Sequence, residues 1–357
     1  MKLQLPLSLA RPLAFAAVTT RLLMGIFLDL PWLYNAGWIA ALGAILLCAP
    51  LGMLADRAAR ACRSGIAEAL EERGGRAVAR PVFALLSLVC IYETAVTSRV
   101  LSNTVRHVAL AEASAISLLL PLLLAAMLCA CLGGQAIGGA ARIWVRVMPV
   151  LMLIVLLLQF RSFRPAWLTP LLGPGANVLA SGTVSASGWL SMAALPWLCA
   201  DREENGAKQR GALSTLVTIG IFSAAVLALL AMMAPPSVRT DLTRTYQLDK
   251  LLANGRVTQT AQLPLILLWY NGLLFNVTAD LFFAAKLLQL TFPRLDGCLA
   301  VLLSGVVSGA VAMLGWAEQR MVVSYARWLF AVVGILMLAL FAAPLRKGGK
   351  RACVHTK

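Results

Sequence analysis

The polar residues of this chain that could bind a charged group stand inside long apolar segments. Thr20 and Arg21 lie about nine residues into the segment 12–32, and Tyr92 and Glu93 about twelve residues into the segment 81–102. At a rise of about 1.5 Å per residue, Arg21 and Glu93 reach similar depth if both segments run the same way. A charge at the centre of a bilayer costs at least about 2.5 kcal/mol. We therefore expect Arg21 to face the inside of the fold, with Glu93 as its partner.

Two further apolar segments, 183–200 and 262–289, also carry small or polar residues at depth. These residues are Ser181, Gly182, Thr183, Ser185, Ser187, Gly188 and Trp189 in or just before the first segment, and Tyr270, Asn271, Asn276 and Asp280 in the second. Glycine and small hydroxyl residues are typical of interrupted membrane helices, whose free backbone groups line a cavity. The sequence predicts such interruptions near Arg21–Gly25 and Ser185–Gly188.

Two alternatives to a binding site remain open at this point. Glycine and serine also permit close helix packing in a membrane. A pair formed by Arg21 and Glu93 could equally be an ion bridge with a purely structural role. The polar residues would then only hold helices together, as in a membrane scaffold.

The cysteine and histidine residues do not predict a metal site or a catalytic centre. Five of the eight cysteines fall within apolar segments, where free thiols act as small hydrophobes. Cys129 and Cys131 are two apart on a helix and point in different directions, which is poor geometry for a metal. His107 and His355 are predicted on opposite sides of the membrane. We expect no enzyme activity, no cofactor and no metal.

The elements that must position these residues are predicted to be membrane helices. Hydrophobic residues make up 60% of the 357 residues, charged residues only 13%, and the mean hydropathy is +0.83. A span needs about 20 mostly apolar residues. On that criterion ten segments qualify: 12–32, 36–55, 81–102, 113–132, 143–161, 183–200, 211–234, 262–289, 297–316 and 324–345.

The ten segments predict an all-α integral membrane protein with a single domain, 1–345, and a basic tail, 346–357. The first and sixth segments carry the expected interruptions and hold corresponding places in two five-helix halves, 12–161 and 183–345. That arrangement is expected of an inverted-repeat transporter fold, whose ligand site lies at mid-membrane where the repeats meet.

The net charge of +16 would suit a nucleic-acid binder, but its distribution favours a membrane explanation. If the N-terminus is cytoplasmic, 20 of the 31 Lys and Arg residues fall on the cytoplasmic side and 10 on the other. Cytoplasmic loops of membrane proteins carry such an excess. We expect both termini in the cytoplasm, the tail in contact with anionic lipids, and no nucleic-acid partner.

Several motifs in the second and third quarters of the chain resemble those of the spore germination permeases. These are the B subunits of spore germinant receptors, within the amino acid–polyamine–organocation superfamily. The motifs are Gly139-Ala140-Ala141-Arg142 before the run 147–158, Leu168-Thr169-Pro170-Leu171-Leu172 with Gly175, the stretch Ser185–Gly188, and Trp269-Tyr270-Asn271-Gly272 with Phe275-Asn276. The order and spacing of the motifs carry the resemblance. Leu190 departs from it, because relatives commonly have a glutamate there.

The resemblance implies a subunit of the spore inner membrane that senses a small nutrient, such as an amino acid, together with A-type and C-type subunits. The alternative within the same fold is an amino-acid or cation-coupled secondary permease. From the residues alone we expect a pocket for a small polar ligand at mid-membrane. Its expected lining is Thr20, Arg21, Gly25, Tyr92, Glu93, Ser185, Ser187, Gly188, Trp189, Tyr270 and Asn271.

Overall fold

The structure is a computed structural model, and it describes residues 3–33, 35–61, 66–108, 112, 114–158, 163–169, 173, 175–201, 211–233, 256–314 and 327–346. Within these residues it consists of helices and connecting turns. The first half contains η1 (Leu7–Leu9), α1 (Ala10–Leu33), α2 (Gly37–Ala61), α3 (Ile66–Gly74), α4 (Arg76–Val108), α5 (Ala115–Cys131) and α6 (Gly134–Leu158). The rest contains η3 (Pro165–Leu168), α7 (Ala176–Ser191), η4 (Met192–Ala194), α8 (Leu195–Cys199), α9 (Ala212–Met233), α13 (Arg256–Thr291), α14 (Gly297–Met313), the π-helical turn η5 (Phe330–Gly334) and α16 (Ile335–Arg346).

In its described residues each of the ten predicted segments is mostly helical, and the short helix α3 is an addition that the sequence did not predict. In the described residues, six helices are long and apolar enough to cross a membrane. They are Gly37–Ala61, Arg76–Asn103, Gly134–Ile154, Ala176–Cys199, Ala212–Met232 and Tyr270–Thr291. Shorter apolar helices cover Ile116–Cys131, Gly297–Met313 and Arg327–Ala343. Except for Arg346, the predicted basic tail lies outside the described residues.

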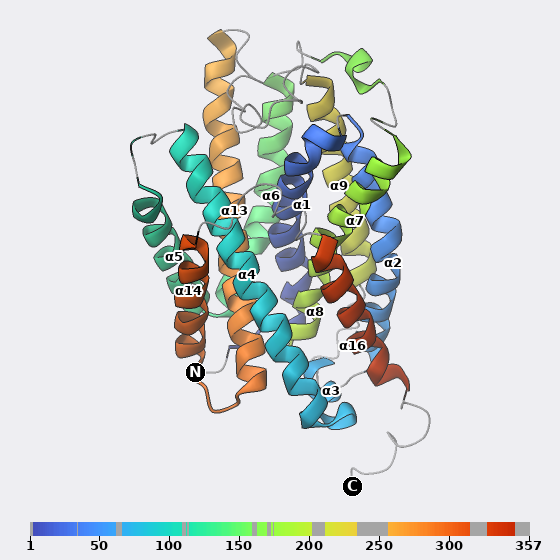
Figure 1. Cartoon of the computed structure of the whole chain (residues 1–357), viewed down its shortest axis with the longest axis vertical. Coiled ribbons are helices and arrows are strands. Elements are labelled where there is room, and N and C mark those ends of the chain that lie inside the picture. The colour runs from blue at the N-terminus through green and yellow to red at the C-terminus, as the bar shows by residue number, and fades with distance from the viewer. Residues whose placement is uncertain are drawn as a thin grey trace.

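Corresponding helices of the two halves pack against each other. In the bundle of Figure 1, α1 packs against α7, α2 against α9, α4 against α13, and α5 against α14. A two-fold relation between the halves, with its axis between the partners of each pair, would produce these four contacts. The first described residues and the end of α16 lie at the same, lower end of the bundle in Figure 1.

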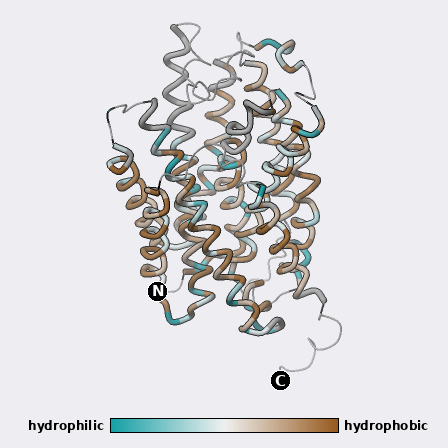
Figure 2. The backbone as a smooth tube through the Cα atoms, viewed as in Figure 1, coloured by the Kyte–Doolittle hydropathy of each residue, from teal (hydrophilic) through white to brown (hydrophobic). Residues whose placement is uncertain are grey.

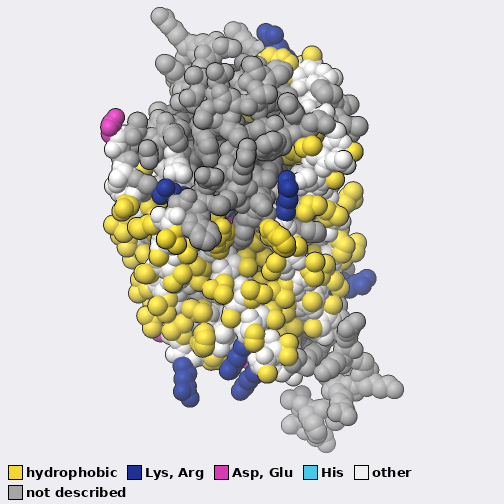
Figure 3. Space-filling model, in the orientation of Figure 1, with side chains coloured by type: hydrophobic (Ala, Val, Ile, Leu, Met, Phe, Trp, Pro, Cys, Tyr) yellow, Lys and Arg dark blue, Asp and Glu magenta, His cyan; other side chains and the backbone are white. Residues whose placement is uncertain are grey.

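The outer surface of the bundle is apolar, as a surface in contact with lipid must be. Hydrophobic residues follow the outer helices α5, α14 and α16 in Figure 2. Large side chains point outward from several helices, among them Leu46, Leu128 and Val306, which are 77%, 70% and 65% exposed. In Figure 3 this hydrophobic face is broad, and Lys and Arg side chains project below its lower edge.

A tight glycine turn brings α6 close to the N-terminal segment. Gly133 has a φ of +88°, a backbone conformation that side chains other than glycine rarely adopt, and it reverses the chain between α5 and α6. A Cβ on the next residue, Gly134, would lie 2.4 Å from the carbonyl oxygen of Gln4. Glycine is therefore needed here for the start of α6 to approach the backbone before α1.

The prediction that the first span is interrupted is wrong, and the sixth span is interrupted at a position other than the predicted one. α1 is continuous from Ala10 to Leu33. A single glycine such as Gly25 is tolerated in a helix at about 1 kcal/mol, and Pro12 stands in the first turn, where proline is accepted.

The sixth span is interrupted at Met192–Ala194, beyond the predicted Ser185–Gly188. Pro196 explains this position, because it lacks an N–H group for the carbonyl of Met192 and its ring crowds that carbonyl. Ser187 lies within the helix, and its hydroxyl donates to the Thr183 carbonyl one turn earlier, at 2.7 Å, so this polar group is satisfied without a break in the helix.

Asp56 of α2 caps the start of α9 across the bundle. Its Oδ1 accepts from the backbone N–H groups of Gly211 and Ala212 at 2.9 and 2.8 Å, and its Oδ2 accepts from Leu213 at 3.2 Å. These groups belong to the first turn of α9, where backbone donors have no partner within the helix. One carboxylate therefore fixes the position of α9 against α2.

Replacing Asp56 by alanine should lower the free energy of unfolding by about 0.5–2 kcal/mol, the usual range for a lost helix cap. The matched control is Arg57→Ala, because Arg57 is exposed on the same turn of α2. Thermal unfolding of the purified protein in detergent measures both. Equal melting temperatures for the two variants would contradict the capping role.

Candidate functional site

Arg21 lies at the centre of a buried ion cluster. Its side chain is 2% exposed, and its Nη2 donates to Oδ2 of Asp280 on α13. Its Nε lies 3.8 Å from Oε2 of Glu93 on α4. The predicted inward direction of Arg21 and its pairing with Glu93 are confirmed. Asp280 is the closer partner, however, and the sequence analysis did not assign it that role.

The geometry of α1 and α13 explains why Asp280 is in reach. Side chains on a helix lean toward its N-terminus, so Arg21 extends toward the end of the bundle where α1 begins. Gly272, Asn276 and Asp280 are spaced by four residues and share one face of α13. A Cβ on Gly272 would lie 2.5 Å from Oγ1 of Thr20, so glycine is required for α1 to approach this face. The four-residue spacing is the signal that could have identified Asp280.

Several buried polar atoms around these helices make no hydrogen bond with the described residues. They include the hydroxyl oxygens of Thr20 and Ser185 and both amide atoms of Asn276. All three residues are at most 2% exposed. A buried polar group without a hydrogen bond costs about 1–3 kcal/mol. These atoms are therefore available to a small polar molecule bound among α1, α7 and α13.

The predicted residues of α7 divide between two faces of the helix. A Cβ on Gly182 would lie 2.5 Å from the Leu33 side chain of α1, and Ser185 and Trp189 follow Gly182 at three and seven residues, on the same face. Ser187 belongs to the other face, where its carbonyl accepts a hydrogen bond from the thiol of Cys48 on α2 at 3.4 Å. The structure therefore directs Ser185 and Trp189 toward α1, and Ser187 toward α2.

The remaining predicted site residues differ in exposure. Gly188 is buried in α7, Tyr92 and Tyr270 are half-buried, and Asn271 is exposed, while its neighbour Gly272 faces Thr20. Gly25 is helical within α1, and its surroundings lie outside the described part of the structure. The structure thus brings Thr20, Arg21 and Glu93 together, and adds Asn276 and Asp280 to them.

A second polar cluster closes the end of the bundle at which α1 begins. Lys286 of α13 donates from Nζ to the carbonyl of Leu3 and to Oδ1 and Oδ2 of Asp201, the latter two at 2.8 and 3.0 Å. The backbone of Leu5 donates to Asp201 at 2.7 Å and accepts from its N–H group at 2.8 Å. Asp201 and Lys286 thereby hold the segment before α1 against the ends of α8 and α13.

A double-mutant cycle should detect the coupling of Arg21 to Asp280. Asp280→Asn alone leaves the guanidinium without its closest partner and should destabilise the protein by about 3–5 kcal/mol. The double change Arg21→Met/Asp280→Asn should cost less than the sum of the single changes. The same cycle with Glu93→Gln should give a smaller coupling, since that contact is longer. Additive losses in unfolding experiments on both cycles would show that the cluster is not coupled.

Loss of the second cluster should expose the buried thiol of Cys199, which is 1% exposed at the end of α8. We expect Lys286→Met to raise the maleimide labelling rate of Cys199, read at that residue by peptide mass spectrometry. Lys286→Arg keeps a charged donor and serves as the control, with labelling close to that of the unmodified chain. Unchanged labelling in Lys286→Met would show that the segment before α1 is held by other contacts.

Solved structures of transporters have a similar fold. A manganese transporter of Eremococcus coleocola, in complex with an aromatic bis-isothiourea substituted compound, is 14% identical, with 95% of this chain and 78% of that chain covered and a TM-score of 0.64. A nucleobase-cation-symport-1 family transporter, closed with bromovinylhydantoin bound, is 13% identical, with 94% and 78% covered and a TM-score of 0.58. Such transporters contain inverted repeats. The similarity of their fold to that of this chain confirms the predicted all-α membrane fold.

At the level of sequence, no curated protein matches the chain. A family model described as "Spore germination protein" matches residues 32–314, which is most of its length. The matched region contains α2, α4, α7 and α13, and with them Glu93, Ser185, Asn276 and Asp280. The chain therefore belongs to the spore germination protein family.

Proposed function

We propose that this chain is the nutrient-sensing membrane subunit of a spore germinant receptor and binds a small polar molecule, such as an amino acid, at mid-membrane. The observation that carries the proposal is the buried cluster of Arg21, Glu93 and Asp280 with unsatisfied polar atoms beside it. The helices that contribute it come from both halves of the fold. Ligand sites of inverted-repeat transporters lie where the repeats meet.

The charges of the cluster favour a ligand that carries an ammonium group. Two carboxylates, Glu93 and Asp280, face one guanidinium, so negative charge is in excess when all three are ionised. A bound ammonium group would balance the excess, and a ligand carboxylate could accept from Arg21 or from the hydroxyl groups of Thr20 and Ser185. An amino acid offers both groups.

The family membership supports A-type and C-type germinant receptor subunits as partners, and the spore inner membrane or the cell membrane as the location. The excess of Lys and Arg on the side of the termini supports a cytoplasmic position for both. No enzymatic step is part of the proposal.

The second candidate is an amino-acid or cation-coupled secondary permease. The transporter fold favours it, because the same scaffold moves ligands in its structural neighbours. The two candidates share the site and differ in whether the ligand crosses the membrane. Uptake of a labelled ligand by proteoliposomes that contain the purified chain separates them, since a receptor subunit should give binding without accumulation inside the vesicles.

The binding site is tested by thermal unfolding of the purified protein with a panel of L-amino acids and small amines. A ligand that binds the folded state stabilises it by about 2.7 kcal/mol at one hundred times its Kd. We expect at least one amino acid to raise the melting temperature. Stabilisation should be reduced in Ser185→Ala, because the side chain of Ser185 faces α1.

Ser187→Ala is the matched control, because it removes the same hydroxyl group two residues later, on the face toward α2. It should keep the full response to the ligand. Equal responses of the two variants would place the site away from this face of α7. The absence of stabilisation by any compound of the panel would favour the scaffold explanation.

Germination assays connect the site to the biological response. Spores that carry Ser185→Ala or Asn276→Ala, with receptor abundance verified, should need a higher nutrient concentration for half-maximal germination. Thr278→Ala is the control on α13, because the Thr278 hydroxyl donates to the Leu274 carbonyl of its own helix at 2.9 Å. An unchanged concentration dependence in both test variants would contradict the proposed site.

A further inference from the structure

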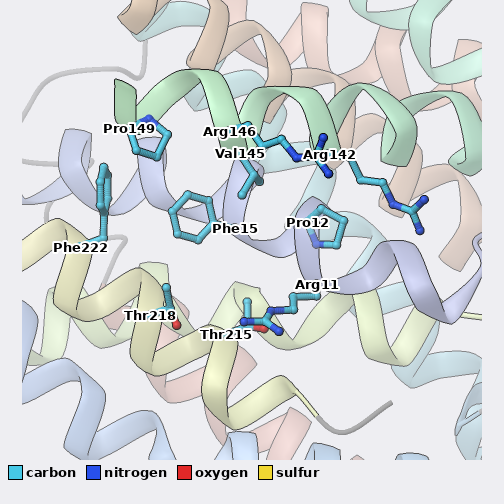
Figure 4. Close-up of a pocket in the computed structure, with 10 residues that line it drawn as sticks. All are labelled: Arg11, Pro12, Phe15, Arg142, Val145, Arg146, Pro149, Thr215, Thr218 and Phe222. Atoms are coloured by element: carbon cyan, nitrogen blue, oxygen red, sulfur yellow. The ribbon is translucent and has the colours of Figure 1, made fainter. Parts of the chain in front are cut away.

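A groove of about 530 Å³ lies between α1, α6 and α9, apart from the ion cluster. Figure 4 shows α6 and α9 on opposite sides of it, with Pro12 and Phe15 of α1 between them. Arg11 comes from the start of α1, and Arg142 and Arg146 come from α6. None of the ion-cluster residues Arg21, Glu93 and Asp280 is among the residues that line this groove.

The lining of the groove changes from polar to apolar in the same direction along all three helices, and the polar residues of α1 and α6 are basic. Arg11 precedes Phe15 on α1, Arg142 precedes Pro149 on α6, and Thr215 precedes Phe222 on α9. α1, α6 and α9 correspond to the first, fifth and seventh spans, which cross the membrane in the same direction. The basic residues therefore gather at one end of the groove, and the apolar residues at the other.

The basic end carries three positive charges that the described residues do not neutralise. No acidic residue lines the groove. Within the described part of the chain, Arg11, Arg142 and Arg146 form no ion pair. Arg142 and Arg146 are one turn apart on α6, so their side chains reach the same region. Guanidinium groups bind phosphate oxygens in a bidentate manner, which suits a phosphate at this end.

The surface beside the groove is suited to contact with lipid. Ile143 and Val150 of α6 are 66% and 56% exposed, and Ile221 of α9 is 54% exposed. These residues flank the lining residues on the same two helices. A lipid could therefore enter the groove from the membrane, and its acyl chain would first contact these outward side chains.

We propose that this groove binds an anionic phospholipid. The phosphate contacts the three arginines, and one acyl chain lies along Phe15, Pro149 and Phe222. The basic end lies at the side of the membrane that holds most Lys and Arg residues, and anionic lipids of that leaflet attract such residues. The bound lipid would join α1 to α6 and α9.

The test is native mass spectrometry of the purified chain titrated with phosphatidylglycerol or phosphatidylcholine of the same acyl composition. We expect phosphatidylglycerol to bind at least tenfold more tightly. The double variant Arg142→Gln/Arg146→Gln should bind it about tenfold or more weakly, given about 1 kcal/mol for each basic residue near an anionic surface. Arg142→Lys/Arg146→Lys keeps the charge and should retain most of the preference.

The control variant Arg57→Gln/Arg294→Gln removes the same charge from two exposed arginines outside the groove, and it should bind phosphatidylglycerol like the unmodified chain. Equal weakening in both double variants would overturn the proposal, because the preference would then reflect net charge alone. Glycerol phosphate at millimolar concentration should not displace the lipid. Displacement by it would assign the groove to a soluble phosphate compound and would also overturn the proposal.

Discussion

A guanidinium group inside a membrane bundle must have partners of opposite charge. The arrangement of α1, α4 and α13 depends on the partners of Arg21. Asp280 and Glu93 reach it from α13 and α4, which belong to different halves of the chain. Removing Asp280 takes away the shorter of these two ion pairs and leaves the guanidinium with the longer contact to Glu93, in a region where water cannot replace the lost partner. The cluster therefore holds α1, α4 and α13 in one arrangement. It also concentrates charge in the region where a small polar ligand would need it.

α1, or the segment just before it, takes part in the ion cluster, the basic groove and the cluster of Lys286 and Asp201. The segment before it is held by Lys286 and Asp201, its first turns line the basic groove, and Thr20 and Arg21 stand at the ion cluster. Because α1 is continuous over these regions, a displacement at one of them is transmitted along a rigid helix. A ligand at the cluster and a lipid in the groove would therefore act on the same element.

The length and apolar composition of the ten segments were sufficient to predict where the helices lie. The repeat arrangement was inferred from interruptions of the first and sixth segments, but the first is continuous and the sixth is interrupted at another position. Burial of Arg21 also followed from the sequence, since the cost of a bilayer charge allows no other direction. The position of the second interruption could not be obtained from the Ser185–Gly188 stretch, because these residues remain helical and Pro196, further along the chain, sets the interruption. The pairing of Asp280 with Arg21 does not follow from the depth of each residue along its own segment. Close approach of α1 and α13 at Gly272 brings Asp280 within reach of the arginine side chain, and that approach depends on tertiary structure.

The central claim is that the cluster around Arg21 recognises an ammonium group on a small polar ligand. Equilibrium binding of the best-stabilising amino acid, compared with its N-acetyl derivative and its amide, tests this most directly. Acetylation removes the ammonium charge, while amidation removes the carboxylate and keeps the ammonium group. The account predicts that acetylation abolishes binding and that the amide is retained with weaker affinity. Binding of the N-acetyl derivative as tight as that of the free amino acid would contradict it.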